Sequence, residues 1–87
     1  MNIAELIQTI DKTIQDSLKF ENSGAAIRLL RIQSEVLFYL IEKGELSMGD
    51  NQKKFYDFIS RFNPEDLYKV AEHYRKSKGK PPLNFYN

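Results

Sequence analysis

The chain has 87 residues, enough for one small domain and too few for two. Hydrophobic residues make up 41% and charged residues 29%, which is typical of a folded globular protein and excludes a disordered chain. No apolar run approaches the roughly 18 residues that a membrane-spanning helix needs, and the absence of cysteine excludes disulfides and thiolate chemistry. We therefore expect a single domain over residues 1–79, followed by a tail of residues 80–87.

The net charge of +1 conceals an asymmetry between the two halves of the chain. Residues 1–50 carry five basic and eight acidic side chains, whereas residues 51–87 carry eight basic and four acidic ones. Such a division favours head-to-tail self-association or an acidic partner for the second half, although it also suits simple solubility. With no secretory signal expected and no cysteine, we expect a cytoplasmic protein. The many Lys, Asn, Ile, Phe and Tyr residues favour a bacterial or phage source of low GC content.

The first predicted helix covers residues 2–18, with Asn2 as its N-cap. Its polar face mixes acids and amides with lysines, so it lacks the basic face that binds anionic lipid, and we expect no membrane binding. A short link at residues 20–22 predicts an antiparallel helical hairpin with the next helix. The apolar face of this first helix consists of Ile3, Leu6, Ile7, Ile10, Ile14 and Leu18.

The second predicted helix, residues 23–43, has so little polar surface that we expect it at the centre of the fold. Asn22 or Ser23 is its expected N-cap, and Gly44 is expected to end it. A second, narrower apolar stripe of Ile32, Val36 and Tyr39 lies opposite the main one. Either the chain's own shorter helices cover both stripes, or the second stripe is left for a partner. The main stripe consists of Ala26, Leu29, Leu30, Leu37, Leu40 and Ile41.

Two shorter helices are predicted over residues 51–62 and 64–77, after a connection of residues 44–50. In the connection, Leu46 and Met48 are expected to face the core, and Ser47 or Asp50 to cap the next helix. The apolar face of the third helix is predicted to consist of Phe55, Phe58, Ile59 and Phe62. The apolar face of the fourth helix is predicted to consist of Leu67, Val70, Ala71 and Tyr74.

The start of the fourth helix is the best-defined boundary in the chain. Asn63 is expected to be its N-cap and Pro64 its first residue, and Gly79 is expected to follow its end. Two prolines prevent residues 80–87 from continuing the helix. The apolar residues Leu83, Phe85 and Tyr86 therefore need a surface, which is either the chain's own core or a partner.

No group of residues predicts catalysis. The one histidine, His73, lies at the edge of an apolar face, and the sequence has no Ser-His-Asp set, His-Glu-x-x-His spacing or glycine-rich phosphate loop. His73 and Asp66 are too few ligands for a metal site. Glu65 and Asp66 are explained by their place at a helix N-terminus. We expect no enzymatic activity, no cofactor, no metal and no small-molecule substrate.

Nucleic-acid binding is the alternative function. The basic residues that favour it are Arg75, Lys76, Lys78 and Lys80, and the helices over 51–62 and 64–77 have the outline of a helix-turn-helix. Against it, Glu65 and Asp66 stand where the second helix would meet the bases and phosphates. The calculated pI near 7.9 is also low for such a domain.

The sequence thus predicts an all-α domain in which a long antiparallel hairpin is closed by two short helices and followed by an extended tail. Its predicted function is binding another protein or a second copy of itself, as a regulator, inhibitor or adaptor. The candidate protein-binding residues are Ile32, Val36, Tyr39, Arg28, Glu35, Phe85 and Tyr86.

Overall fold

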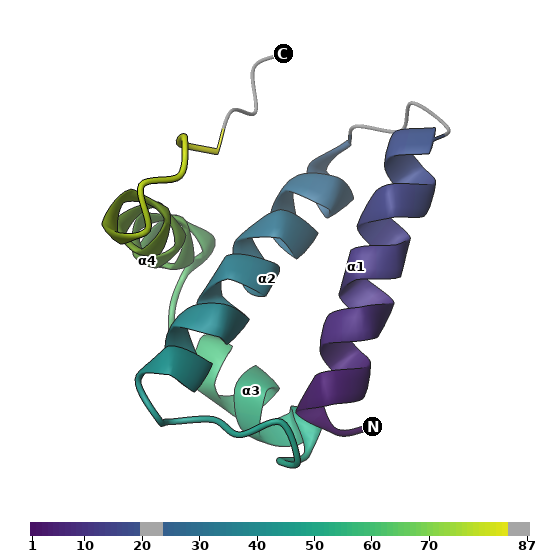
Figure 1. Cartoon of the computed structure of the whole chain (residues 1–87), viewed down its shortest axis with the longest axis vertical. Coiled ribbons are helices and arrows are strands. Elements are labelled where there is room, and N and C mark those ends of the chain that lie inside the picture. Colours follow the sequence, from purple (N-terminus) through teal and green to yellow (C-terminus); the bar gives the residue numbers. More distant parts are fainter. Residues whose placement is uncertain (20–23, 84–87) are drawn as a thin grey trace.

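The computed structural model describes residues 1–19 and 24–83. Over these residues it contains four α-helices and no named strand: α1 (Ile3–Lys19), α2 (Ala25–Glu42), α3 (Gln52–Ile59) and α4 (Pro64–Ser77). Helices α1 and α2 lie side by side and antiparallel, α3 lies at one end of this hairpin, and α4 crosses α2 on the side away from α1 (Figure 1). The predicted all-α fold, with a long hairpin closed by two short helices, is confirmed.

The start of α1 is fixed by its own cap and by the loop before α3. The Asn2 side chain accepts a hydrogen bond from the Glu5 N–H at 2.8 Å, and the Glu5 carboxylate accepts one from the Asn2 N–H at 3.1 Å. This reciprocal pair satisfies two N–H groups that the helix leaves without partners. The Ile3 N–H also donates to the Asp50 carbonyl at 2.8 Å, and the Ala4 N–H to the Met48 carbonyl at 3.0 Å. These long-range bonds join the first turn of the chain to the loop that positions α3.

Helix α2 is the centre of the fold, as its composition predicts. Val36 and Leu37, adjacent in the sequence, are both 0% exposed, because α4 and α1 cover different sides of the helix. The predicted cap at Asn22 or Ser23 is wrong: the N-cap is Gly24, in an extended conformation and without a side-chain capping bond. The link over residues 20–23 lies outside the described residues. Gly44 follows the helix with φ +78°, so its predicted role at the C-terminus is confirmed.

The core lies where the inner faces of all four helices meet. Two residues of the predicted main stripe of α2 lie outside it: Ala26 is exposed, and Leu29 is 41% exposed. Ile27, which belongs to neither predicted stripe, is 7% exposed and buried. The core cluster consists of Ile3, Leu6, Ile10, Ile32, Val36, Leu37, Leu40, Leu46, Phe55, Leu67, Ala71 and Leu83.

The bounds of α4 agree with the prediction, whereas α3 is shorter than predicted. The Asn63 side chain caps α4 by accepting a hydrogen bond from the Asp66 N–H at 2.8 Å, and Pro64 is the first helical residue. Helix α3 is capped by Asn51 and not by Ser47 or Asp50, and it ends at Ile59. Its predicted fourth core residue, Phe62, therefore falls beyond the helix and is 42% exposed.

The loop over residues 44–50 buries one of its two apolar side chains. Leu46 is 5% exposed, as predicted, but Met48 is 47% exposed, and its predicted place in the core is wrong. The Met48 carbonyl accepts the Ala4 N–H, which fixes the backbone with this side chain in solvent. The Asp50 carboxylate accepts the Ser47 N–H at 2.9 Å and lies 3.3 Å from the Lys54 ammonium. The Asp50 side chain thus links the loop, through Ser47, to α3, through Lys54.

The Asp50 contacts predict a pH-dependent stability. The Ser47 N–H, and after it Lys54, lower the pKa of Asp50 below its usual value. A lowered pKa in the folded state stabilises the fold above the unfolded pKa, and this contribution is lost as the pH falls through the folded pKa. We expect Asp50→Asn to lower the Tm at about pH 7 and to leave it nearly unchanged at about pH 2, measured by circular dichroism. A Tm difference that persists undiminished at the lower pH would contradict this role.

Candidate functional site

The stripe of α2 that was predicted as a docking surface is covered by α4. Ile32 and Val36 are 5% and 0% exposed and belong to the core. Tyr39 is half-buried, and its ring meets that of Tyr74 on α4 edge-on, with 6.3 Å between the centroids. The apolar face of α4 and this stripe bury each other, as the first of the two interpretations expects. Ile32 and Val36 are therefore corrected from candidate interface residues to core residues.

The structure joins one residue from each of the two rival predicted sites. Glu35 of the protein-binding set and Arg75 of the nucleic-acid set form an ion pair, with 2.7 Å between Oε1 and Nη1. Their side chains are only 12% and 17% exposed. A pair so shielded from water binds α4 to α2, because separating the partners would leave a partly buried charge without compensation. Arg28 is exposed on α2, and Phe85 and Tyr86 lie outside the described residues.

Of the four basic residues predicted to bind nucleic acid, two form ion pairs with acids of α2 and two do not. Lys78 lies 2.7 Å from the Glu42 carboxylate, and this hydrogen bond raises the pKa of the Lys78 ammonium. With Arg75 bound to Glu35, two of the four basic side chains are paired with acids of the same chain. Lys76 and Lys80 are exposed. The set therefore does not form a continuous row of cations along one face.

Residues 80–83, called the arm below, fold back along α4. The Arg75 Nε donates a hydrogen bond to the Pro81 carbonyl at 2.7 Å, and the Leu83 N–H donates to the Glu72 carboxylate at 2.8 Å. Leu83 is 9% exposed and belongs to the core. One basic and one acidic side chain of α4 thus hold the backbone of the arm, and the tail up to Leu83 lies on the chain's own core.

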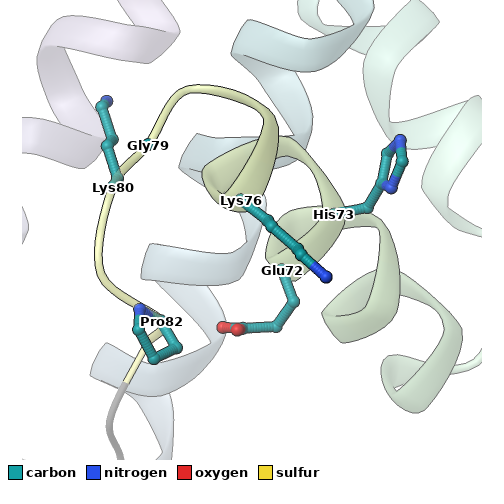
Figure 2. A pocket seen from close by; sticks show the side chains of 6 residues that line it. All are labelled: Glu72, His73, Lys76, Gly79, Lys80 and Pro82. Carbon is teal, nitrogen blue, oxygen red and sulfur yellow. The ribbon is translucent and has the colours of Figure 1, made fainter.

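A hollow of about 510 Å³ lies between the arm and α4 (Figure 2). Glu72 extends from α4 toward Pro82, while His73 and Lys80 stand at opposite sides of the view. One oxygen of Glu72 is already bonded to the Leu83 N–H. Across residues 1–19 and 24–83, no three His, Asp or Glu side chains come together as a metal site would require. The hollow is lined by Glu72, His73, Lys76, Gly79, Lys80 and Pro82.

A second hollow, of about 380 Å³, is lined by Pro82 and Leu83 of the arm and is called the Glu35 hollow below. It combines apolar side chains with the Glu35–Arg75 pair. The second carboxylate oxygen of Glu35, Oε2, is buried and has no hydrogen-bond partner among the described residues. The hollow is lined by Ile14, Arg31, Ser34, Glu35, Arg75, Pro82 and Leu83.

A third hollow, of about 320 Å³, was not predicted from the sequence. The exposed ring of Phe62 lies beside it and contacts Phe58, with 5.1 Å between the ring centroids. The sequence could have indicated that Phe62 lies outside α3. The predicted N-cap at Asn63 requires a non-helical backbone there, so the preceding helix has to end before it. The α3 surface, as this region is called below, consists of Phe62 and the residues that line the hollow, namely Leu40, Glu45, Leu46, Lys54, Asp57, Phe58 and Arg61.

Comparisons of the chain with known protein families, curated proteins and solved structures found no match. None of the described helices has the length and apolar character needed to cross a membrane.

Proposed function

We propose that this chain is a non-enzymatic protein-binding module, of the kind that acts as a regulator, inhibitor or adaptor, and that a second copy binds to its α3 surface. One observation carries this proposal. Phe62 is 42% exposed, and its ring contacts that of Phe58, which lines a hollow together with Leu40 and Leu46. Exposed aromatic rings beside an apolar hollow are typical anchors of protein interfaces.

The charges around the hollow support a second copy as the partner. Two acids, Glu45 and Asp57, and two bases, Lys54 and Arg61, line it together with the apolar residues. In a two-fold dimer the same patch faces itself, so it has to be complementary to itself. A border with equal numbers of acids and bases meets this requirement, because each acid has a base to face on the other copy.

The nucleic-acid alternative has weaker support. Arg75 and Lys78 already pair with Glu35 and Glu42, and each would have to leave a carboxylate at 2.7 Å to bind a phosphate. Lys76 and Lys80 alone are too few for the basic patch that phosphate binding depends on.

Light scattering of the purified protein tests the proposal. We expect a mass that rises with concentration toward twice the 10.2 kDa of one chain. We expect Phe62→Glu to weaken the dimer by about 30-fold or more, since truncating an anchor residue costs at least ~2 kcal/mol of binding. Tyr56→Glu is the matched control. Tyr56 is 40% exposed on α3, but it is two residues from Phe58 and therefore about 200° away from it around the helix axis.

Three outcomes would contradict the proposal or redirect it. A wild-type chain that remains monomeric at the highest concentration would remove the second copy as partner. Equal weakening by Phe62→Glu and Tyr56→Glu would show that the dimer does not use the α3 surface. A mass that increases with added DNA or RNA at low salt only would favour the nucleic-acid alternative.

A further inference from the structure

The arm is attached to the helices by few contacts. The Leu83 N–H donates to the Glu72 carboxylate at 2.8 Å, and the Leu83 side chain is 9% exposed. The Arg75 Nε donates to the Pro81 carbonyl at 2.7 Å. Pro82, between these contacts, is exposed and lines both the hollow beside Glu72 and the Glu35 hollow (Figure 2). A segment with so little buried surface is typical of those that open while the rest of the fold remains intact.

The arm leaves α4 through one tight turn. Gly79 has φ +70°, and its N–H donates to the Lys76 carbonyl at 3.1 Å. The Lys80 N–H donates to the Arg75 carbonyl at 3.0 Å, which completes the usual pattern of a helix that ends in a left-handed glycine. A change of backbone angles at this turn moves the arm away from α4 and leaves the helix itself in place.

One of the two side chains that bind the arm is held independently of it. The Arg75 Nη1 lies 2.7 Å from Glu35 of α2, and the two side chains are only 17% and 12% exposed. The guanidinium therefore keeps its position, with Nε available, when the arm moves away. A donor fixed in advance loses little entropy when it binds a ligand, so this site is pre-organised for an extended segment.

The contacts of the arm define the pattern that the site recognises. They use the carbonyl of residue 81, and the N–H and apolar side chain of residue 83. The residue between them is a proline, which has no N–H to satisfy. Proline also favours an extended conformation before binding, and this lowers the entropic cost of docking. The recognised pattern is therefore any residue, then a proline, then an apolar residue.

We propose that the arm is a releasable strap over a docking site on α4, and that this site binds an extended segment of a partner protein with the same pattern. The arm occupies the site in the resting chain. After the arm opens, the partner's segment donates its N–H to Glu72, accepts from Arg75 Nε and places its apolar side chain where Leu83 lay. This site is separate from the α3 surface. Phe62→Glu is expected to leave it intact, so failure of the proposed dimer and failure of this site are distinguishable.

Amide hydrogen exchange of the full-length protein, followed by NMR, tests whether the arm opens by itself. We expect the Leu83 N–H to be at least about 10-fold less protected than that of Ala71, a residue of α4 that is 0% exposed. Gly79→Val strains the left-handed turn, so it should lower the protection of Leu83 by a further factor of about 5 to 30. Gly44→Val is the matched control, because Gly44 also has a positive φ, of +78°, but follows α2. At both glycines an added Cβ meets nothing within 4 Å.

A peptide titration tests the docking site. The probe is acetyl-Lys-Pro-Pro-Leu-N-methylamide, and it is added to full-length Leu83→Ala, whose arm has lost its apolar side chain. The Nε–H signal of Arg75 is followed by NMR. We expect a saturable shift with a Kd on the order of 1 mM, and binding to the wild type at least about 10-fold weaker, because the arm occupies the site there. A matched probe with a methylated leucine nitrogen lacks the N–H that Glu72 accepts, and we expect it to bind at least about 10-fold more weakly.

The two experiments can each overturn the proposal. Equal protection of Leu83 and Ala71, or an equal effect of the two glycine variants on Leu83, would show that the arm does not open by itself. This result uses the wild-type core, so it does not depend on whether Leu83→Ala folds. Equal binding of the two probes, equal binding to wild type and variant, or no saturable shift in a folded variant would exclude the docking site. A shift of the variant's Arg75 signal by added unlabelled wild-type chain would show that the occupant is the arm of a second copy instead.

Discussion

Val36→Glu is expected to unfold the protein. Val36 is 0% exposed and belongs to the core between α2 and α4, so the new carboxylate would lie among apolar side chains. Burying a carboxylate without a partner costs several kcal/mol, comparable with the ~5–15 kcal/mol that stabilises a whole small domain. Circular dichroism should show loss of the cooperative thermal transition and of most helical signal.

Phe38→Glu is the matched control for this substitution. Phe38 lies two residues along the same helix and is 38% exposed. A glutamate there remains in water, so we expect a folded protein whose free energy of unfolding changes by about 1 kcal/mol or less. If Val36→Glu instead kept the wild-type Tm and changed only the solution mass, the stripe of Ile32, Val36 and Tyr39 would be an open interface and α4 would be misplaced.

The helices follow from local patterns that the sequence shows directly. The spacing of apolar residues predicts each helix, and Gly44, Asn63 and Gly79 mark boundaries that the structure confirms. The scarcity of polar residues on α2 predicts its central place. Each of these inferences depends only on residues within a turn or two of each other, where helical geometry fixes which side chains share a face.

The errors arise where burial depends on the placement of another helix. Leu29 has the right spacing for the core, but it is 41% exposed, whereas Ile27, two residues earlier on α2, is buried. Phe62 has the right spacing as well, but α3 ends at Ile59, so that spacing no longer places it on a helix face. Helical periodicity identifies the apolar face of a helix, whereas the length and position of its neighbours decide how much of that face is covered.

The candidate sites were less predictable than the fold. Glu35 and Arg75 are forty residues apart, and their pairing depends on how α4 crosses α2. The sequence places Glu35 at the polar edge of a helix and Arg75 in a basic run, and neither pattern predicts that the two residues form a pair. The roles of Phe85 and Tyr86, and the domain boundary between residues 79 and 80, remain predictions.

Phe55→Ala is expected to lower the free energy of unfolding by about 3–5 kcal/mol, the usual cost of truncating a fully buried phenylalanine. Phe55 is 0% exposed and is the only buried residue of α3. A helix of eight residues is not stable alone, so α3 depends on this side chain to remain docked. Urea denaturation measures the loss. Tyr56→Ala, at a neighbouring position that is 40% exposed, should cost about 1 kcal/mol or less.

Because α3 depends on Phe55 to remain docked, Phe55→Ala should also affect the α3 surface. Four of the side chains that line its hollow, Lys54, Asp57, Phe58 and Arg61, belong to α3 or to the turn that follows it. We expect Phe55→Ala to weaken the proposed dimer together with the fold, whereas Phe62→Glu should weaken the dimer at nearly unchanged stability. If Phe55→Ala lost its stability but kept the wild-type dimer, the interface would have to be formed by α1, α2 and α4 without α3.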